Sequence, residues 1–456
     1  MRLILLELNE LSPVLMEKFM AAGKVPNFKR LHDESQVSIT EAETRAPDLE
    51  PWIQWVTVHS GVPYQEHQIH HLGDGNQLDH KSLWDLASDA GKSVWVCGSM
   101  NINYEQPING WVLPDPWVRK TPPYPEEELG AYYRFVSANV QEHTSGKVPL
   151  SRSEQVDFLK FMARHGLRPG TVASIMRQIA SERFSKTGWR RAVILDRLQL
   201  DVFRWHYKRA QPDFATFFLN STAHYQHLYW RNMEPEHFKV KPEPGEQEVY
   251  QEAILYGYQQ MDKMLPKLLS LAGPDTAVVL LTALSQQPSV KYEDIGGKVL
   301  YRPNDFDTLL DAIDIPGGEV TPVMAEEFNI DFPSEEAAEA AEAKLEAMNV
   351  NGEPAMRSKR EGNGIKSGCK VWRQLDDDAK LTLGDGREIP FFDLFYKLDL
   401  MKSGEHHPDG MMWIRTPDRR HSVLEEKVPL VSVAPTLMEL AGVPIPSEMH
   451  GEPVPA

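Results

Sequence analysis

Four short apolar runs separated by helical patterns restrict the folds open to this sequence. They occupy residues 3–8, 93–97, 214–219 and 277–282. Runs of this length without alternating polar residues are typical of strands buried on both faces of a parallel sheet, with helices as the crossovers. The pattern predicts an α/β fold: a doubly wound, mostly parallel sheet sandwiched by helices.

The chain has 456 residues, which is long for one hydrophobic core. We expect an α/β core from residues 1–120, 205–300 and 401–456. The Pro-rich start and helical, charged pattern of residues 121–204 predict a helical insertion over the strand ends, placed to act as a lid. Residues 301–400 predict a small α+β insertion. Within it, Ser334 as N-cap, acids in the first turn, and apolar residues on one side predict a helix; the apolar residues are Ala337, Ala341, Leu345 and Met348.

The net charge and the hydropathy of the chain limit the classes of partner that it can bind. The formal net charge of −18 argues against a nucleic-acid surface, which needs clustered Lys and Arg. No run reaches the roughly 20 apolar residues of a membrane span. Glu7 and Glu10 interrupt the apolar start, which predicts a core strand and not a signal peptide. Cys97 and Cys369 are the only cysteines, which fits a reducing compartment, so we expect a cytoplasmic protein. The expected partner is a small-molecule or glycan substrate. The sequence does not indicate the oligomeric state.

Several longer sequence segments contain these apolar runs or lie between and after them. They are residues 3–13, 25–31 (VPNFKRL), 49–62, 220–230 (NSTAHYQHLYW), 277–288, 405–414 and 431–444 (VSVAPTLMELAGVP). The order and residue patterns of these segments resemble motifs of the alkaline phosphatase superfamily, in particular of its type I phosphodiesterase and nucleotide pyrophosphatase branch. The C-terminal phrases carry the most specific part of this resemblance.

The resemblance implies a two-metal site, but this sequence departs from it at most ligands. Asn9 stands where the family has a metal-binding Asp, and Pro51 stands at the nucleophile. In the segment that normally reads Asp, three residues, His, the first position is Ala223, while His227 is kept. The family's Ser-Asp-His-Gly is replaced by residues 283–286 (ALSQ), and His406 is retained. A standard two-zinc site is therefore not expected.

The remaining polar residues define candidate sites. The candidate catalytic residues are Glu7, Glu10, Asp48, Glu50 and His227. The candidate substrate-binding residues are Asn9, Trp52, Trp111, His224, Ser285 and Gln286. The candidate ligands of a single divalent metal, zinc or manganese, are His227 and His406; a site without any metal is the alternative. Simpler interpretations are helix capping by the acids before Pro51, core packing of the tryptophans and hydrogen-bonded histidines without a metal.

Three functions remain open at this point. The first is a divergent hydrolase or transferase acting on a phosphate-, sulfate- or sugar-containing substrate at a single-metal or metal-free site. The second is a catalytically inactive relative that binds a ligand or a partner. The third is a metal-independent carbohydrate-active enzyme that uses paired carboxylates. Fold alone does not decide among them.

Overall fold

The computed structural model describes residues 1–118, 120–145, 150–323, 326–398 and 401–455. Its central sheet has nine strands in the order β20-β2-β19-β6-β1-β5-β3-β4, with β21 beside β2. The strands are β1 (Arg2–Leu8), β2 (Gln36–Glu41), β3 (Val94–Cys97), β4 (Gly110–Leu113), β5 (Phe214–Leu219), β6 (Thr276–Leu281), β19 (Asp409–Arg415), β20 (Ser422–Val423) and β21 (Val428–Pro429). β1 runs parallel to both of its neighbours, and β19 is antiparallel to β2 and β6. The predicted mostly parallel sheet is confirmed.

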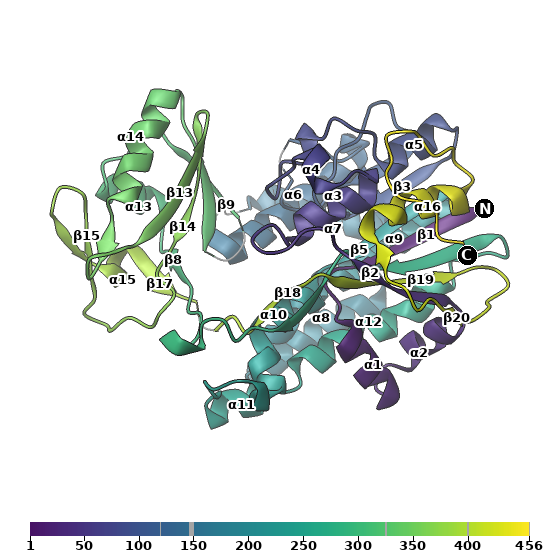
Figure 1. The fold of residues 1–456 in the computed structure, drawn as a ribbon, viewed down its shortest axis with the longest axis horizontal. Helices are drawn as coiled ribbons and strands as arrows, with labels where there is room; N and C mark the ends of the chain where they lie inside the picture. Colours follow the sequence, from purple (N-terminus) through teal and green to yellow (C-terminus); the bar gives the residue numbers. More distant parts are fainter. Residues whose placement is uncertain (119, 146–149, 324–325, 399–400, 456) are drawn as a thin grey trace.

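Helices cover both faces of this sheet (Figure 1). Side chains alternate along β1, so that Ile4 and Leu6 join one hydrophobic core and Leu3 and Leu5 join another. The first core is covered by α1 (Pro13–Ala21), α2 (Pro26–Asp33), α9 (Ala192–Ala210), α10 (Ser221–Met233) and α12 (Ala253–Leu269). The second is covered by α3 (Pro51–Ser60), α5 (Leu83–Asp89) and α16 (Val433–Ala441). Two shorter helices are α4 (Tyr64–His67) and α11 (Pro244–Tyr250).

Three further helices precede α9. They are α6 (Glu126–Ser145), α7 (Arg152–Arg164) and α8 (Pro169–Glu182). Leu129 and Tyr132 of α6 and Phe158 and Phe161 of α7 belong to the first core, so these two helices pack on the sheet through large apolar side chains. α8 buries no side chain.

A separate lobe lies beside the large sheet, on the left of Figure 1. Its own hydrophobic core includes Phe328, Ile330, Leu345, Ile365 and Phe391. The lobe's helices are α13 (Phe306–Ala312), α14 (Glu335–Glu346) and α15 (Phe391–Leu394). Its strands are β8 (Tyr301–Pro303), β9 (Glu319–Pro322), β10 (Glu327–Asp331), β11 (Asn349–Val350), β12 (Glu353–Pro354), β13 (Met356–Glu361), β14 (Gly364–Cys369), β15 (Lys380–Thr382), β16 (Glu388–Pro390) and β17 (Phe395–Lys397). They form antiparallel sheets in the orders β13-β14-β10-β9, β12-β11-β15-β16 and β17-β8.

The helix predicted after Ser334 is α14. The Ser334 side chain accepts a hydrogen bond from the amide of Ala337, and Ala341 and Leu345 are buried. Local capping and periodicity were therefore sufficient to locate this helix.

A short antiparallel pair links the sheet to the site. β7 (Ser285–Pro288) follows β6, β18 (Gly404–His407) precedes β19, and His406 lies opposite Gln286. Since β1 and β5 end at the same edge as β6, the residues that follow these strands are brought together with this pair.

The length and hydropathy of the helices show whether any of them could cross a membrane. Among the described residues, none of the helices combines the length and apolar character that a bilayer span requires.

Candidate functional site

Glu10 lies at the centre of the site, two residues after β1 ends. It is 2 % exposed, and its backbone has the left-handed φ of 60°, which aims the side chain across the strand ends. The Gln226 side-chain amide donates to the Glu10 carbonyl at 2.6 Å and stabilises this conformation. Glu10 Oε2 then lies 3.1 Å from His227 Nε2 and 3.3 Å from His406 Nε2.

The hydrogen bond on the far side of His227 fixes its tautomer. His227 Nδ1 lies 3.1 Å from the Gly404 carbonyl, which can only accept, so Nδ1 carries the proton. Burial lowers the pKa of His227 to about 4, which makes the ring neutral near pH 7. With the ring neutral, the unprotonated Nε2 faces a carboxylate oxygen 3.1 Å away, so a cation placed between these two atoms would be bound by both.

These separations match the edge of a metal coordination shell. With zinc bonds of about 2.0–2.1 Å, two tetrahedral ligand atoms lie about 3.3 Å apart. Glu10 Oε2 is 3.1 and 3.3 Å from the two histidine nitrogens, and the three potential ligand atoms all lie within 4.8 Å of one another. The buried His406 Nε2 also has no hydrogen-bond partner within the described chain. One cation fits this donor set.

His406 connects Glu10 to a second carboxylate. Its Nδ1 lies 3.3 Å from Glu50 Oε2. Burial alone lowers the pKa of His406, but Glu50 and Glu10 outweigh that effect and raise the pKa above its usual value. Likewise, burial raises the pKa of Glu10, but His406 and His227 hold it well below the ordinary range. Without a metal, His406 can therefore be protonated and lie as an imidazolium between the carboxyl groups of Glu10 and Glu50.

Glu50 is the residue that precedes α3, and its carboxylate makes no capping hydrogen bond to that helix. The side chain is 31 % exposed, and burial raises its pKa. The capping interpretation therefore does not account for Glu50, whose carboxylate faces His406 instead. A carboxyl group with a raised pKa retains its proton to higher pH than an exposed glutamate does, which suits a group that donates or accepts a proton.

Asn9 is buried and its amide is fully engaged. Nδ2 donates to Glu10 Oε1 at 2.8 Å and to Asn220 Oδ1 at 2.7 Å, while Oδ1 accepts from Trp55 Nε1 at 2.8 Å. These bonds orient the Glu10 carboxylate.

The described residues next to the Glu10, His227 and His406 group offer few ligands for a second metal. Gln286 directs its Nε2, a donor, at Glu10 Oε2 and also donates to the Ala223 carbonyl at 3.0 Å. Around this position the available groups are the amides of Asn9 and Gln286, which carry no negative charge. These hydrogen bonds are compatible with the expectation that a standard two-zinc site is not formed.

Three other predicted site residues lie elsewhere or face away. Trp111 is on the edge strand β4, where its Nε1 donates to Glu128 at 3.0 Å. His224 is exposed on α10 and is not part of the Glu10, His227 and His406 group. Asp48 is exposed, and its carboxylate interacts with Tyr64.

The remaining predicted residues have structural partners. Glu7 is fully buried, accepts from Ser99 at 2.6 Å and lies 2.8 Å from His59 Nε2. Trp52 donates from Nε1 to the His70 carbonyl at 3.1 Å. Ser285 is buried in β7, in register with His407. The structure thus brings Glu10, Asn9, Glu50, His227, His406 and Gln286 together, and leaves these others outside that group.

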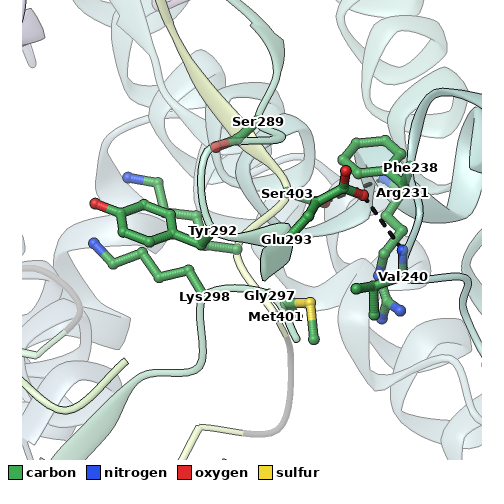
Figure 2. A pocket seen from close by; sticks show the side chains of 11 residues that line it. Arg231, Phe238, Val240, Ser289, Tyr292, Glu293, Gly297, Lys298, Met401 and Ser403 are labelled. Carbon is green, nitrogen blue, oxygen red and sulfur yellow. Dashed lines mark hydrogen bonds between the residues drawn. The ribbon is translucent and has the colours of Figure 1, made fainter. Parts of the chain in front are cut away.

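Two lysine side chains near the site were not predicted from the sequence. The charge of Lys402 acts on Glu50, His227 and His406, and that of Lys298 acts on Glu50. Both lysines line a pocket together with Arg231, Ser289 and Tyr292, and Figure 2 shows Lys298 beside Tyr292. The pocket adjoins α10, because the Ser403 amide donates to the His227 carbonyl at 2.7 Å. No spacing rule in the sequence marks these lysines.

A second group of possible ligands lies in the helical region. Glu128 Oε1 is 3.7 Å from His165 Nε2 and 3.8 Å from His206 Nδ1. Both separations exceed the edge of about 3.3 Å expected for tetrahedral zinc. The Glu10 group is therefore the better candidate.

No protein-family model matches this sequence, and no curated protein matches it either. Solved structures do align over nearly its whole length. Phosphonoacetate hydrolase from Sinorhizobium meliloti 1021, in complex with phosphonoacetate, is 12 % identical with a TM-score of 0.44, covering 96 % of this chain and 95 % of that one. Wild-type alkaline phosphatase PafA is 12 % identical with a TM-score of 0.47, covering 99 % and 98 %.

Murine ectonucleotide pyrophosphatase/phosphodiesterase 5 is 9 % identical with a TM-score of 0.41, covering 98 % of this chain and 96 % of that one. All three proteins are members of the alkaline phosphatase superfamily, to which the sequence motifs are similar. These likenesses concern the course of the chain and not its chemistry.

Proposed function

We propose that this protein is a hydrolase or transferase that acts on a phosphate-, sulfate- or sugar-containing substrate at a single-cation site formed by Glu10, His227 and His406. The observation that carries the proposal is the contact between His227 Nε2 and Glu10 Oε2 at 3.1 Å, with His227 Nδ1 bonded to the Gly404 carbonyl. With Nδ1 holding the proton of the neutral ring, a cation bound between Nε2 and the carboxylate would supply the positive charge that stabilises these two acceptors.

Each side chain of the site has a distinct role in this proposal. A divalent cation bound there supplies positive charge to a substrate oxygen and to the developing charge of the reaction. Glu50, with its raised pKa, holds or releases a proton beside His406. Lys402 and Lys298 attract an anionic substrate group into the adjoining pocket. Asn9 and Gln286 orient the Glu10 carboxylate.

Metal analysis of the purified protein tests the cation. We expect about one divalent ion per chain, zinc or manganese, measured by inductively coupled plasma mass spectrometry. The ion should be lost from His227→Ala and retained by His224→Ala, which changes an exposed histidine on the same helix. Wild-type protein without a stoichiometric ion after incubation with zinc or manganese would rule out the single-cation site.

Activity assays then distinguish the three functions. Phosphodiester, phosphate monoester, sulfate ester and aryl glycoside substrates should be tested with the wild type and with Glu50→Gln. Metal-dependent turnover of one class, reduced in Glu50→Gln, supports the proposal. Metal-independent glycoside hydrolysis abolished by Glu50→Gln supports a paired-carboxylate enzyme instead. Stoichiometric metal without turnover on any substrate supports a binding protein.

A further inference from the structure

The helix α8 differs from its neighbours in having no buried side chain. Val172, Met176 and Ile179 are spaced four and three residues apart, so they form one stripe along the helix. These side chains are 41 %, 61 % and 45 % exposed, and Phe184, two residues beyond the helix, is 89 % exposed. Single exposed apolar residues are common, but a stripe of large ones indicates a surface that something covers.

The inner side of this helix is attached to the protein. Ile175 packs against the first hydrophobic core, as does Trp189, which follows shortly after the helix. The apolar stripe is therefore held in place on the surface and does not belong to a detached segment. Substitutions along it should leave the fold intact.

The charge around α8 is opposite to that of the whole protein. Residues 151–212 contain thirteen Lys and Arg against five Asp and Glu, although the chain has a net charge of −18. Arg177 on the helix, and Arg183 and Lys186 just after it, are exposed, and within the described part of the chain none of these three forms an ion pair. The apolar stripe thus lies among cations that are free to meet an anionic surface.

We propose that α8 is a membrane-docking helix that lies on an anionic lipid bilayer, with Val172, Met176, Ile179 and Phe184 inserted at the interface. Amphipathic helices of this kind combine an apolar face containing aromatic or aliphatic residues with Lys and Arg on the remaining surface. The basic residues complement negative lipid headgroups, whereas the acidic remainder of the protein is repelled by them. This inference is independent of the proposed catalytic site and requires no membrane span.

Vesicle co-sedimentation tests the proposal with the full chain. Wild-type protein should pellet with large vesicles of equal parts phosphatidylglycerol and phosphatidylcholine, much less with phosphatidylcholine alone, and less as salt is raised. Met176→Asp/Ile179→Asp should lose vesicle binding. The matched control Val14→Asp/Val423→Asp adds the same charge at two exposed apolar positions, 74 % and 61 % exposed, and should bind as wild type does.

Two results would overturn this assignment. One is a wild type that stays in the supernatant with phosphatidylglycerol vesicles, or a Met176→Asp/Ile179→Asp variant that pellets as well as the wild type. The other is concentration-dependent self-association that this variant abolishes while vesicles have no effect, which would identify a second copy of the chain as the partner. Circular dichroism spectra of both variants should match that of the wild type.

Discussion

Glu10 Oε2 lies 3.1 Å from His227 Nε2, and the proton of the His227 ring is committed to the Gly404 carbonyl on the other side. The carboxylate and the unprotonated nitrogen therefore converge on one point. This contact is the basis of the proposed cation site, which the Glu10→Gln variant tests.

Glu10→Gln should reduce the bound divalent metal from about one ion per chain to little or none, because the amide loses the negative charge that zinc or manganese binds. Metal content measured by mass spectrometry after gel filtration checks this. His165→Ala in the second group is the control and should keep the ion, since its separation from Glu128 is 3.7 Å. Equal metal content in Glu10→Gln and wild type would contradict the assignment.

Glu7→Gln should lower stability while leaving metal binding unchanged. Glu7 is fully buried, accepts a hydrogen bond from Ser99 and lies 2.8 Å from His59 Nε2. An amide in place of the carboxylate disturbs these bonds, and we expect a loss of about 1–3 kcal/mol. Urea denaturation gives the free energy of unfolding. A stable variant that loses only activity would instead indicate a catalytic role for Glu7.

Asn9→Ala should destabilise the protein and weaken metal binding together. The substitution leaves the buried indole N–H of Trp55 without its acceptor, at a cost of about 1–3 kcal/mol. It also removes the amide that holds Glu10 Oε1 at 2.8 Å. Calorimetric titration with zinc, alongside thermal denaturation, measures both effects. Unchanged zinc affinity would show that Asn9 supports the fold and not the carboxylate.

Asp196 should contribute to stability an amount that falls as pH rises from about 4 to about 7. Burial raises the pKa of this carboxyl to about 7, although Ser221 and Arg197 act in the opposite direction. The unfolded chain releases the proton near pH 4, so unfolding releases a proton throughout this interval and becomes more favourable as pH rises.

Asp196→Asn should therefore reduce this decline, since the amide does not titrate, and can still accept from the Ser221 hydroxyl that contacts Asp196. Denaturation midpoints at pH 5 and pH 7.5 give the comparison. Asp377→Asn, at an exposed position, should follow the wild type. A variant that declines as steeply as the wild type would show that other groups cause the effect.

Much of the fold could be predicted from short stretches of sequence. Runs of apolar residues identified β1, β3, β5 and β6, and the cap and periodicity after Ser334 identified α14. The motifs also identified His227 and His406 as neighbours. These features are encoded locally, or in phrases similar to those of a known family.

Other parts of the site could not be predicted from residue spacing. His224 and His227 are three positions apart on α10, yet only His227 joins Glu10, because the rotation between them leaves His224 exposed. The sequence places Trp111 in a segment expected to border the site, but its strand β4 lies three strands from β1.

The sequence by itself determined the buried strands and the capped helix after Ser334, and the expectation that a standard two-zinc site is absent also came from it. Only the tertiary structure decided that Glu10 joins His227 and His406, that Glu50 reaches His406, and that Glu7 pairs with His59. The physical reason is that burial and backbone conformation follow from neighbouring residues, whereas the meeting of side chains depends on strand order and register across distant segments.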